Sequence, residues 1–128
     1  MNDATLRRMS RFDTADLGPH ATALYRELTR TAAAGLPLAT VILAASIVDV
    51  VRHELAGPVG CLDGGALSHA GNTANLGWLR GRRNHFVHHE GPSDGLMGES
   101  DAGLWLGSDA ERAVITLLDF LDDLQLSN

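Results

Sequence analysis

The segment from Trp78 to Glu90 concentrates side chains that suit phosphate chemistry. It reads WLRGRRNHFVHHE and holds three of the ten arginines and three of the six histidines. Arginine offers a planar fork of permanently charged donors that fits the oxygens of a phosphate. Histidine titrates near neutral pH, so it can give or accept a proton under working conditions. We therefore take this segment as a candidate phosphodiester site.

The spacing of these residues predicts that several share one face of a helix. Residues four apart stack on a helix surface, and Arg80, Asn84 and His88 have this spacing. Arg83 falls on an adjoining arc with apolar neighbours, near the edge expected to be buried. A guanidinium, a carboxamide and an imidazole would then gather at one helix end. The alternative is a solvated basic face whose histidines only cover that end.

Charge limits how such a site can bind nucleic acid. The chain has no lysine, 10 arginines and 16 acidic residues, giving a net charge of −6 with neutral histidines. This excludes a protein that binds nucleic acid non-specifically over its whole surface, because such binding needs a positive field over the whole domain. A phosphodiester ligand would have to bind a local patch within an acidic surround, and we expect its contacts from Arg80, Arg82 and His85.

The helices that position these residues follow from turn signals and glycine content. Twelve of the fourteen glycines lie between positions 57 and 107, and they separate the helical patterns. We expect helices from near Asp16 to Gly35, from Pro37 to Ala56, from about Ala74 to Glu90, and from Ser108 onward. This pattern indicates an all-α fold, a four- to five-helix up-and-down bundle. The length suits one domain over residues 1–128, with residues 1–13 flexible or loosely packed.

Apolar periodicity supports two of these helices. The expected core stripe of the second helix is Leu38, Val41, Ile42, Ala45, Val48 and Leu55. The expected stripe of the last helix is Val114, Leu117, Leu118, Leu121 and Leu124. On that helix Asp119, Asp122 and Asp123 would form a solvated face. Ser108 and Glu111 have the spacing of a capping box, which predicts the helix start.

The remaining composition bounds the environment of the protein. A single cysteine, Cys61, excludes an internal disulfide framework and a cysteine-based zinc cluster. The N-terminal residues lack the apolar stretch of a signal peptide. The longest apolar run, about 13 residues, is shorter than the ~20 that a membrane helix needs. We therefore expect a cytoplasmic protein with no membrane partner.

The motif and the helix order resemble the HEPN (higher eukaryotes and prokaryotes nucleotide-binding) domain family. Arg83-Asn84, followed by His88, matches the family signature of an arginine and a histidine separated by four to six residues. The Ala-rich stretch 42–49 is similar to an earlier helix of the family, which often carries an acid at the position of Asp49. The resemblance covers about residues 20–125.

This resemblance implies a dimer in which the motif helices of two copies form one composite site. Many members are metal-independent RNA endonucleases without a cofactor, including toxins, which pair with an antitoxin protein, and defence nucleases. His88 would then act as general acid or base while the RNA 2′-hydroxyl attacks the adjacent phosphorus. Arg83 would stabilise charge on the phosphate, and Asn84 would hold its neighbours in place.

The same residues leave three alternatives open. His89 also has the motif spacing from Arg83, so either it or His88 can be the acid or base; the His-x-Tyr continuation of family toxins is absent. Asp49 either orients Arg83 or His88 from a facing helix or is a buried structural partner of an arginine. Some family members are non-catalytic interaction or regulatory modules, which is the alternative function.

A metal site is a further interpretation of the histidines. His85 and His89 are four apart, and they could share a divalent ion with Glu90 or His53. The chain lacks a His-Glu-x-x-His motif, and the family resemblance needs no metal. We therefore expect none.

Overall fold

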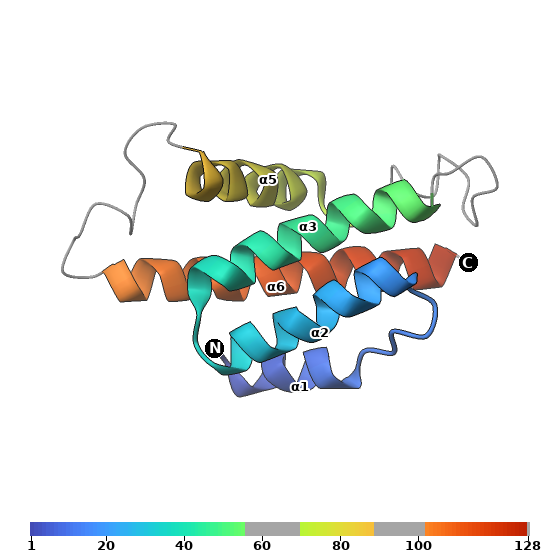
Figure 1. The fold of residues 1–128 in the computed structure, drawn as a ribbon, viewed down its shortest axis with the longest axis horizontal. Helices are drawn as coiled ribbons and strands as arrows, with labels where there is room; N and C mark the ends of the chain where they lie inside the picture. The colour runs from blue at the N-terminus through green and yellow to red at the C-terminus, as the bar shows by residue number, and fades with distance from the viewer. Residues whose placement is uncertain (56–69, 89–101, 128) are drawn as a thin grey trace.

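The computed structural model describes residues 1–55, 70–88 and 102–127, and within these ranges it contains helices and no strand. The helices are α1 (Asp3–Arg11), α2 (Pro19–Ala33), α3 (Pro37–Leu55), α5 (Thr73–Val87) and α6 (Ala102–Ser127). Successive helices alternate in direction along the long axis of the molecule, as the colours in Figure 1 show. The prediction of an all-α bundle is confirmed for the described part of the chain.

Short polar and glycine signals set the helix ends. The side chain of Asn2 caps α1 by accepting a hydrogen bond from the amide of Ala4 at 2.7 Å. Asn72 caps α5 in the same way, accepting from the amide of Asn75 at 3.0 Å. These caps satisfy amides that have no partner inside the helix. Gly35 follows α2 with a φ of +70°, a conformation that favours glycine.

The central element is α3, which packs against α2, α5 and α6. Its buried apolar side chains are Val41, Ala44, Ala45, Ile47, Val48 and Val51. The predicted single stripe is therefore too narrow, because Ala44, Ile47 and Val51 lie outside it. It is also wrong at its start, where Leu38 is 38% exposed. A helix that contacts neighbours on several sides must be apolar on several sides.

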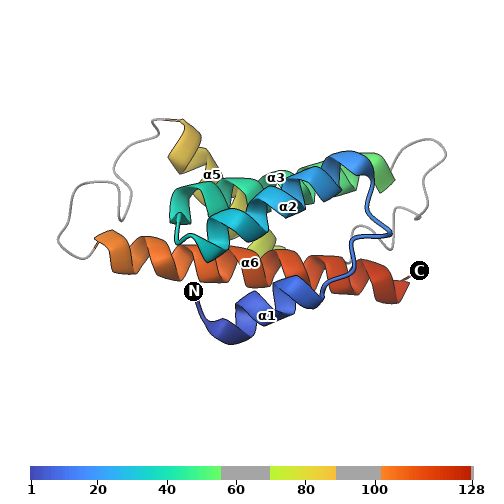
Figure 2. The same cartoon turned by 60° about the horizontal axis from the view of Figure 1, so that its bottom comes forward.

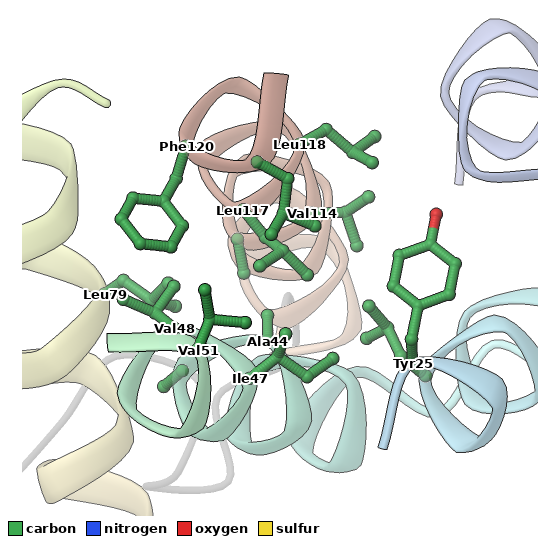
Figure 3. Close-up of a cluster of buried hydrophobic side chains, with 14 of the residues drawn as sticks. Tyr25, Ala44, Ile47, Val48, Val51, Leu79, Val114, Leu117, Leu118 and Phe120 are labelled. Atoms are coloured by element: carbon green, nitrogen blue, oxygen red, sulfur yellow. The ribbon is translucent and has the colours of Figure 1, made fainter. Parts of the chain in front are cut away.

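The core takes buried side chains from all five described helices, and one part of it lies where α3, α5 and α6 meet. Figure 3 shows Val48 and Val51 of α3, Leu79 of α5 and Leu117 and Phe120 of α6 in one cluster. The predicted stripe of the last helix is confirmed, since all five of its residues are buried. Each large apolar side chain buried in this way contributes about 1.5–3 kcal/mol to folding. This packing fixes α5, and with it the candidate site, on the bundle.

The N-terminal residues differ from the loosely packed segment expected from the sequence. Residues 3–11 form α1, which lies along α6 (Figure 2), and its Met9 side chain is only 2% exposed. Arg8 donates to the carboxylates of Asp119 at 2.8 Å and of Asp122 at 2.7 Å. These two acids of the expected solvated face thus hold α1 in place.

The predicted start of the last helix is also wrong. α6 begins at Ala102, six residues before Ser108, so the capping box does not form at a helix end. Glu111 instead accepts hydrogen bonds from the Thr5 hydroxyl and, at 3.1 Å, from the backbone amide of Asn2. A tertiary contact with α1 therefore takes the carboxylate that the local pattern assigned to capping.

Tyr25 of α2 ties α1 to the core through a buried phenol. Its hydroxyl donates to the carbonyl of Met9 at 2.7 Å, and its ring centroid is 5.3 Å from that of Phe12. Burial, and to a lesser degree the charge of Asp122, raises the pKa of Tyr25 well above its ordinary value of 10.0. The folded protein therefore keeps this proton to a higher pH than the unfolded chain does.

We expect the free energy of unfolding to fall as the pH rises above about 10. The stabilisation is complete below the unfolded pKa of the phenol, and it is lost as the pH rises toward the higher folded pKa. Because the chain has no lysine, few other groups titrate in this range. Urea denaturation between about pH 8 and pH 11 measures the effect. The control is Tyr25→Phe, whose stability should lack this fall; parallel curves would contradict the prediction.

Candidate functional site

The segment predicted to hold the site lies on α5, which packs against α3 and α6 (Figure 1). The helix ends at Val87, before the predicted end at Glu90. His88 is its C-cap residue, with extended backbone angles (φ −124°, ψ 140°) and an amide that donates to the carbonyl of Asn84 at 2.9 Å. His89 and Glu90 lie outside the described residues.

Arg83 is held against α3 by an ion pair. Its Nη1 donates to Oδ2 of Asp49 at 2.5 Å, and its Nη2 lies 3.4 Å from Oδ1 of Asn84. The Arg83 side chain is 21% exposed, which agrees with its predicted place near the buried edge. The structure thus brings together the arginine of the motif, its neighbouring carboxamide and the acid on the facing helix.

Arg82, one of the expected RNA contacts, is paired with an acid of α6. Its Nε donates to Oδ2 of Asp109 at 2.5 Å, and the Arg82 side chain is only 11% exposed. The guanidinium also lies over the ring of Phe86, 4.8 Å from the centroid. Arg82 therefore ties α5 to α6, an arrangement that fits a structural role for this residue.

The other motif side chains lie at the rim of the helix. Arg80, His85 and His88 are exposed, and Asn84 is half-buried. The predicted helix face of Arg80, Asn84 and His88 does not extend to His88, because the backbone is extended at that residue. Within the described ranges, no hydrogen bond or ion pair joins Arg83 to His88. The site of one chain therefore presents a fixed arginine and a separate, accessible imidazole.

Arg52 of α3 belongs to the same region, and sequence reasoning missed it. Arg52, Arg80, Arg83 and Asp49 line a crevice between α3 and α5 with about 10 Å³ of space, enough for about one water molecule. The Arg52 guanidinium also lies 5.5 Å from the ring centroid of Phe120. The missed signal is spacing: Arg52 follows Asp49 by three residues, which places both on one helix face.

The described part of the chain holds neither a cluster of metal ligands nor a membrane-spanning helix. No three His, Cys, Asp or Glu side chains there are placed to hold one metal ion. Of the histidine cluster considered from the sequence, His89 and Glu90 fall outside that part. None of the described helices combines the length and the apolar character needed to cross a bilayer.

Comparison of the chain with protein-family models, with curated proteins and with solved structures finds no match. The family resemblance therefore remains an expectation from the motif residues and the helix order.

Proposed function

We propose that this protein is a metal-independent RNA endonuclease of the HEPN type that acts as a homodimer in the cytoplasm. The observation that supports this most is the arrangement around Arg83. Asp49 fixes its guanidinium at 2.5 Å, Asn84 adjoins it, and His88 is exposed at the end of the same helix. An oriented cation and an accessible imidazole are groups that can stabilise charge and transfer a proton when a phosphodiester is cleaved.

The proposed reaction is an internal transesterification of RNA. His88 or His89 takes the proton of a 2′-hydroxyl, whose oxygen attacks the adjacent phosphorus. The bond from phosphorus to the 5′-oxygen breaks. A protonated histidine from either copy in the dimer supplies the proton to that oxygen. The products are a 2′,3′-cyclic phosphate and a 5′-hydroxyl. Arg83 stabilises the negative charge that grows on the phosphate oxygens, and Asn84 keeps the guanidinium in place.

A homodimer through α5 is supported by a glycine on that helix. A Cβ added at Gly81 would meet nothing within 4 Å. Glycine inside a helix costs about 1 kcal/mol relative to alanine, and no packing among the described residues of one chain explains this cost at Gly81. A second α5 that approaches this surface closely would explain it.

Gly81→Ala is expected to change folding and dimerisation in opposite directions. The monomer should gain about 0.5–1 kcal/mol, whereas the added methyl group should weaken the dimer. Thermal unfolding at low protein concentration measures the first effect, and sedimentation equilibrium measures the second. Gly107→Ala is the control, because it makes the same exchange at an equally open position on α6, outside the proposed interface, and should leave the dimer intact. An unchanged dimer in Gly81→Ala would rule out the α5 interface.

Cleavage of RNA in EDTA tests the proposed function. The wild type should cut without added metal, and His88→Ala or His89→Ala should lose about 10²–10⁴-fold in rate. The variant that loses activity identifies the acid or base. His20→Ala on α2 is an exposed control that should cleave normally. A folded wild-type dimer that cuts none of several RNAs would overturn the proposal.

The ion pairs of the site favour the second candidate function, a non-catalytic HEPN-like interaction or regulatory module. Both Arg82 and Arg83 are paired with carboxylates, Asp109 and Asp49, so their charges are largely neutralised. Such a module would bind a partner protein without cleaving RNA.

Under the nuclease proposal, a toxin or defence role predicts that expression of the protein arrests cell growth, that the arrest depends on His88 or His89, and that an antitoxin partner relieves it.

A further inference from the structure

A second hollow lies along the same helix pair, toward the start of α5. Its volume is about 220 Å³, and its lining residues are Arg52, Thr73, Leu76, Gly77 and Arg80. Arg52, Leu76 and Arg80 also line the crevice at Arg83. The two spaces therefore adjoin along the contact between α3 and α5. We call this space the Arg52–Arg80 hollow.

The two arginines that flank this hollow differ from those that hold the fold together. Arg8, Arg82 and Arg83 each form an ion pair with an aspartate. Arg52 and Arg80 pair with no carboxylate in the described part of the chain. In a protein with a net charge of −6, two uncompensated guanidinium groups facing one hollow create a local positive field that attracts anions.

The hollow also offers preorganised donors of different kinds. Arg52 is half-buried and held against the Phe120 ring, so its guanidinium loses little freedom when it binds a ligand. The first turn of α5 begins at Thr73, whose backbone amide has no acceptor within the helix and whose hydroxyl is a further donor. The positive end of the helix dipole adds to the attraction for an anion. Gly77 lines the hollow without a side chain.

We propose that the Arg52–Arg80 hollow binds a phosphate group of the RNA strand, next to the phosphate that is cleaved. Guanidinium groups from α3 and α5 would donate to its oxygens from two sides, as bidentate arginine contacts do. Arg80 precedes Arg83 by less than one helical turn. A strand that places one phosphate at Arg83 and lies along α5 therefore brings its neighbouring phosphate to the hollow. The identity of the strand rests on the proposed function, whereas the binding of phosphate does not depend on cleavage.

The test measures binding separately from cleavage. The probe is a fluorescently labelled single-stranded RNA carrying 2′-O-methyl groups, which has no nucleophilic hydroxyl and stays intact. Fluorescence anisotropy gives its dissociation constant for the wild type, Arg52→Gln and Arg80→Gln. Loss of one charged hydrogen-bonding partner should weaken binding by about tenfold or more. The salt dependence of log K should also become shallower by about 0.7 for each arginine that contacts a phosphate.

The matched control is Arg26→Gln on α2, which removes an exposed arginine away from α5 and should leave binding unchanged. Circular dichroism shows whether each variant keeps its helices. Equal RNA affinity in the wild type and in both hollow variants would overturn the proposal. Inorganic phosphate and a mononucleotide form the second arm. If these bind in an Arg52- and Arg80-dependent way but the RNA does not, the hollow is a site for free phosphate and the RNA assignment fails.

Failure of this inference is distinguishable from failure of the proposed function. Arginine-dependent binding of the intact probe by a protein that cuts no RNA would support the hollow and overturn the nuclease. Cleavage that depends on His88 or His89, with unchanged probe binding in the Arg52 and Arg80 variants, would support the nuclease and overturn the hollow.

Discussion

Arg83→Gln is expected to lower the rate of RNA cleavage by about 10²–10³-fold, the effect of removing one fixed donor that stabilises transition-state charge. Glutamine can still accept and donate hydrogen bonds, but it carries no charge and cannot reach a phosphate with a planar fork. The loss should therefore fall mainly on kcat. Single-turnover cleavage of a defined RNA in EDTA measures it, with circular dichroism and sedimentation as checks on fold and dimer.

Arg83→Lys and Asp49→Asn complete this test. Lysine retains the positive charge without the fork, so Arg83→Lys should recover only part of the rate. If Asp49 positions Arg83, then Asp49→Asn should lower kcat and alter the pH–rate profile while the protein stays folded. If Asp49 is only a structural partner, the same variant should lower the unfolding free energy and leave the pH–rate profile unchanged. Full activity in Arg83→Gln would contradict the catalytic role.

Phe120→Ala should produce the largest loss of stability, about 3–5 kcal/mol of unfolding free energy. The Phe120 side chain has no exposed surface and packs in the cluster of Figure 3 beside Leu79 and Leu117. Removing the ring leaves a cavity where α3, α5 and α6 meet, and it removes the aromatic face beneath the Arg52 guanidinium. Urea unfolding monitored by circular dichroism measures the change.

Ile115→Ala on the same helix is the matched control for Phe120→Ala. Ile115 is 38% exposed, so its truncation should cost much less, within about 1 kcal/mol. Phe120→Leu should fall between the two because it refills part of the cavity. A Phe120→Ala variant as stable as Ile115→Ala would show that the three-helix junction does not carry the stability assigned to it.

Local patterns were sufficient for the parts of the fold that depend on local physics. Gly35 and Pro37 mark the end of α2 and the start of α3 because these residues free or restrict the backbone directly. The start of α2 lies at Pro19, three residues after the expected start near Asp16. The stripe of α6 was predictable because apolar residues on one face of a helix have few alternatives to burial. The burial of α3 on several sides was not, since it depends on which helices surround it.

Polar contacts between distant segments could not be predicted in the same way. Arg8, Asp119 and Asp122 have the sequence pattern of solvated helix faces, and only the docking of α1 on α6 turns them into an ion-pair cluster. Glu111 likewise fits a capping box locally, but it bonds Thr5, which is distant in sequence. A charged residue has the same local sequence pattern whether its charge is solvated by water or paired with a residue of another helix.

In the candidate site too, the features set within one helix could be predicted and the contacts between helices could not. The edge position of Arg83 followed from helix periodicity, and Asp49 followed from the family resemblance. The pairing of Arg82 with Asp109 and the approach of Arg52 depend on how α3, α5 and α6 cross, which no spacing along one helix specifies.

Asp49 and Arg52 are carried by the same helix that supplies Ile47 and Val51 to the core. The orientation of the Arg83 guanidinium therefore depends on the packing of the interior. Asp49 holds this group, and a helix that is packed on three sides cannot move without disturbing its neighbours. A cavity introduced at Ile47 would be expected to rotate α3 slightly, and so to shift Asp49 and Arg52. Substitutions in this interior are then constrained by folding and also by the positions of the Arg52 and Arg83 guanidinium groups.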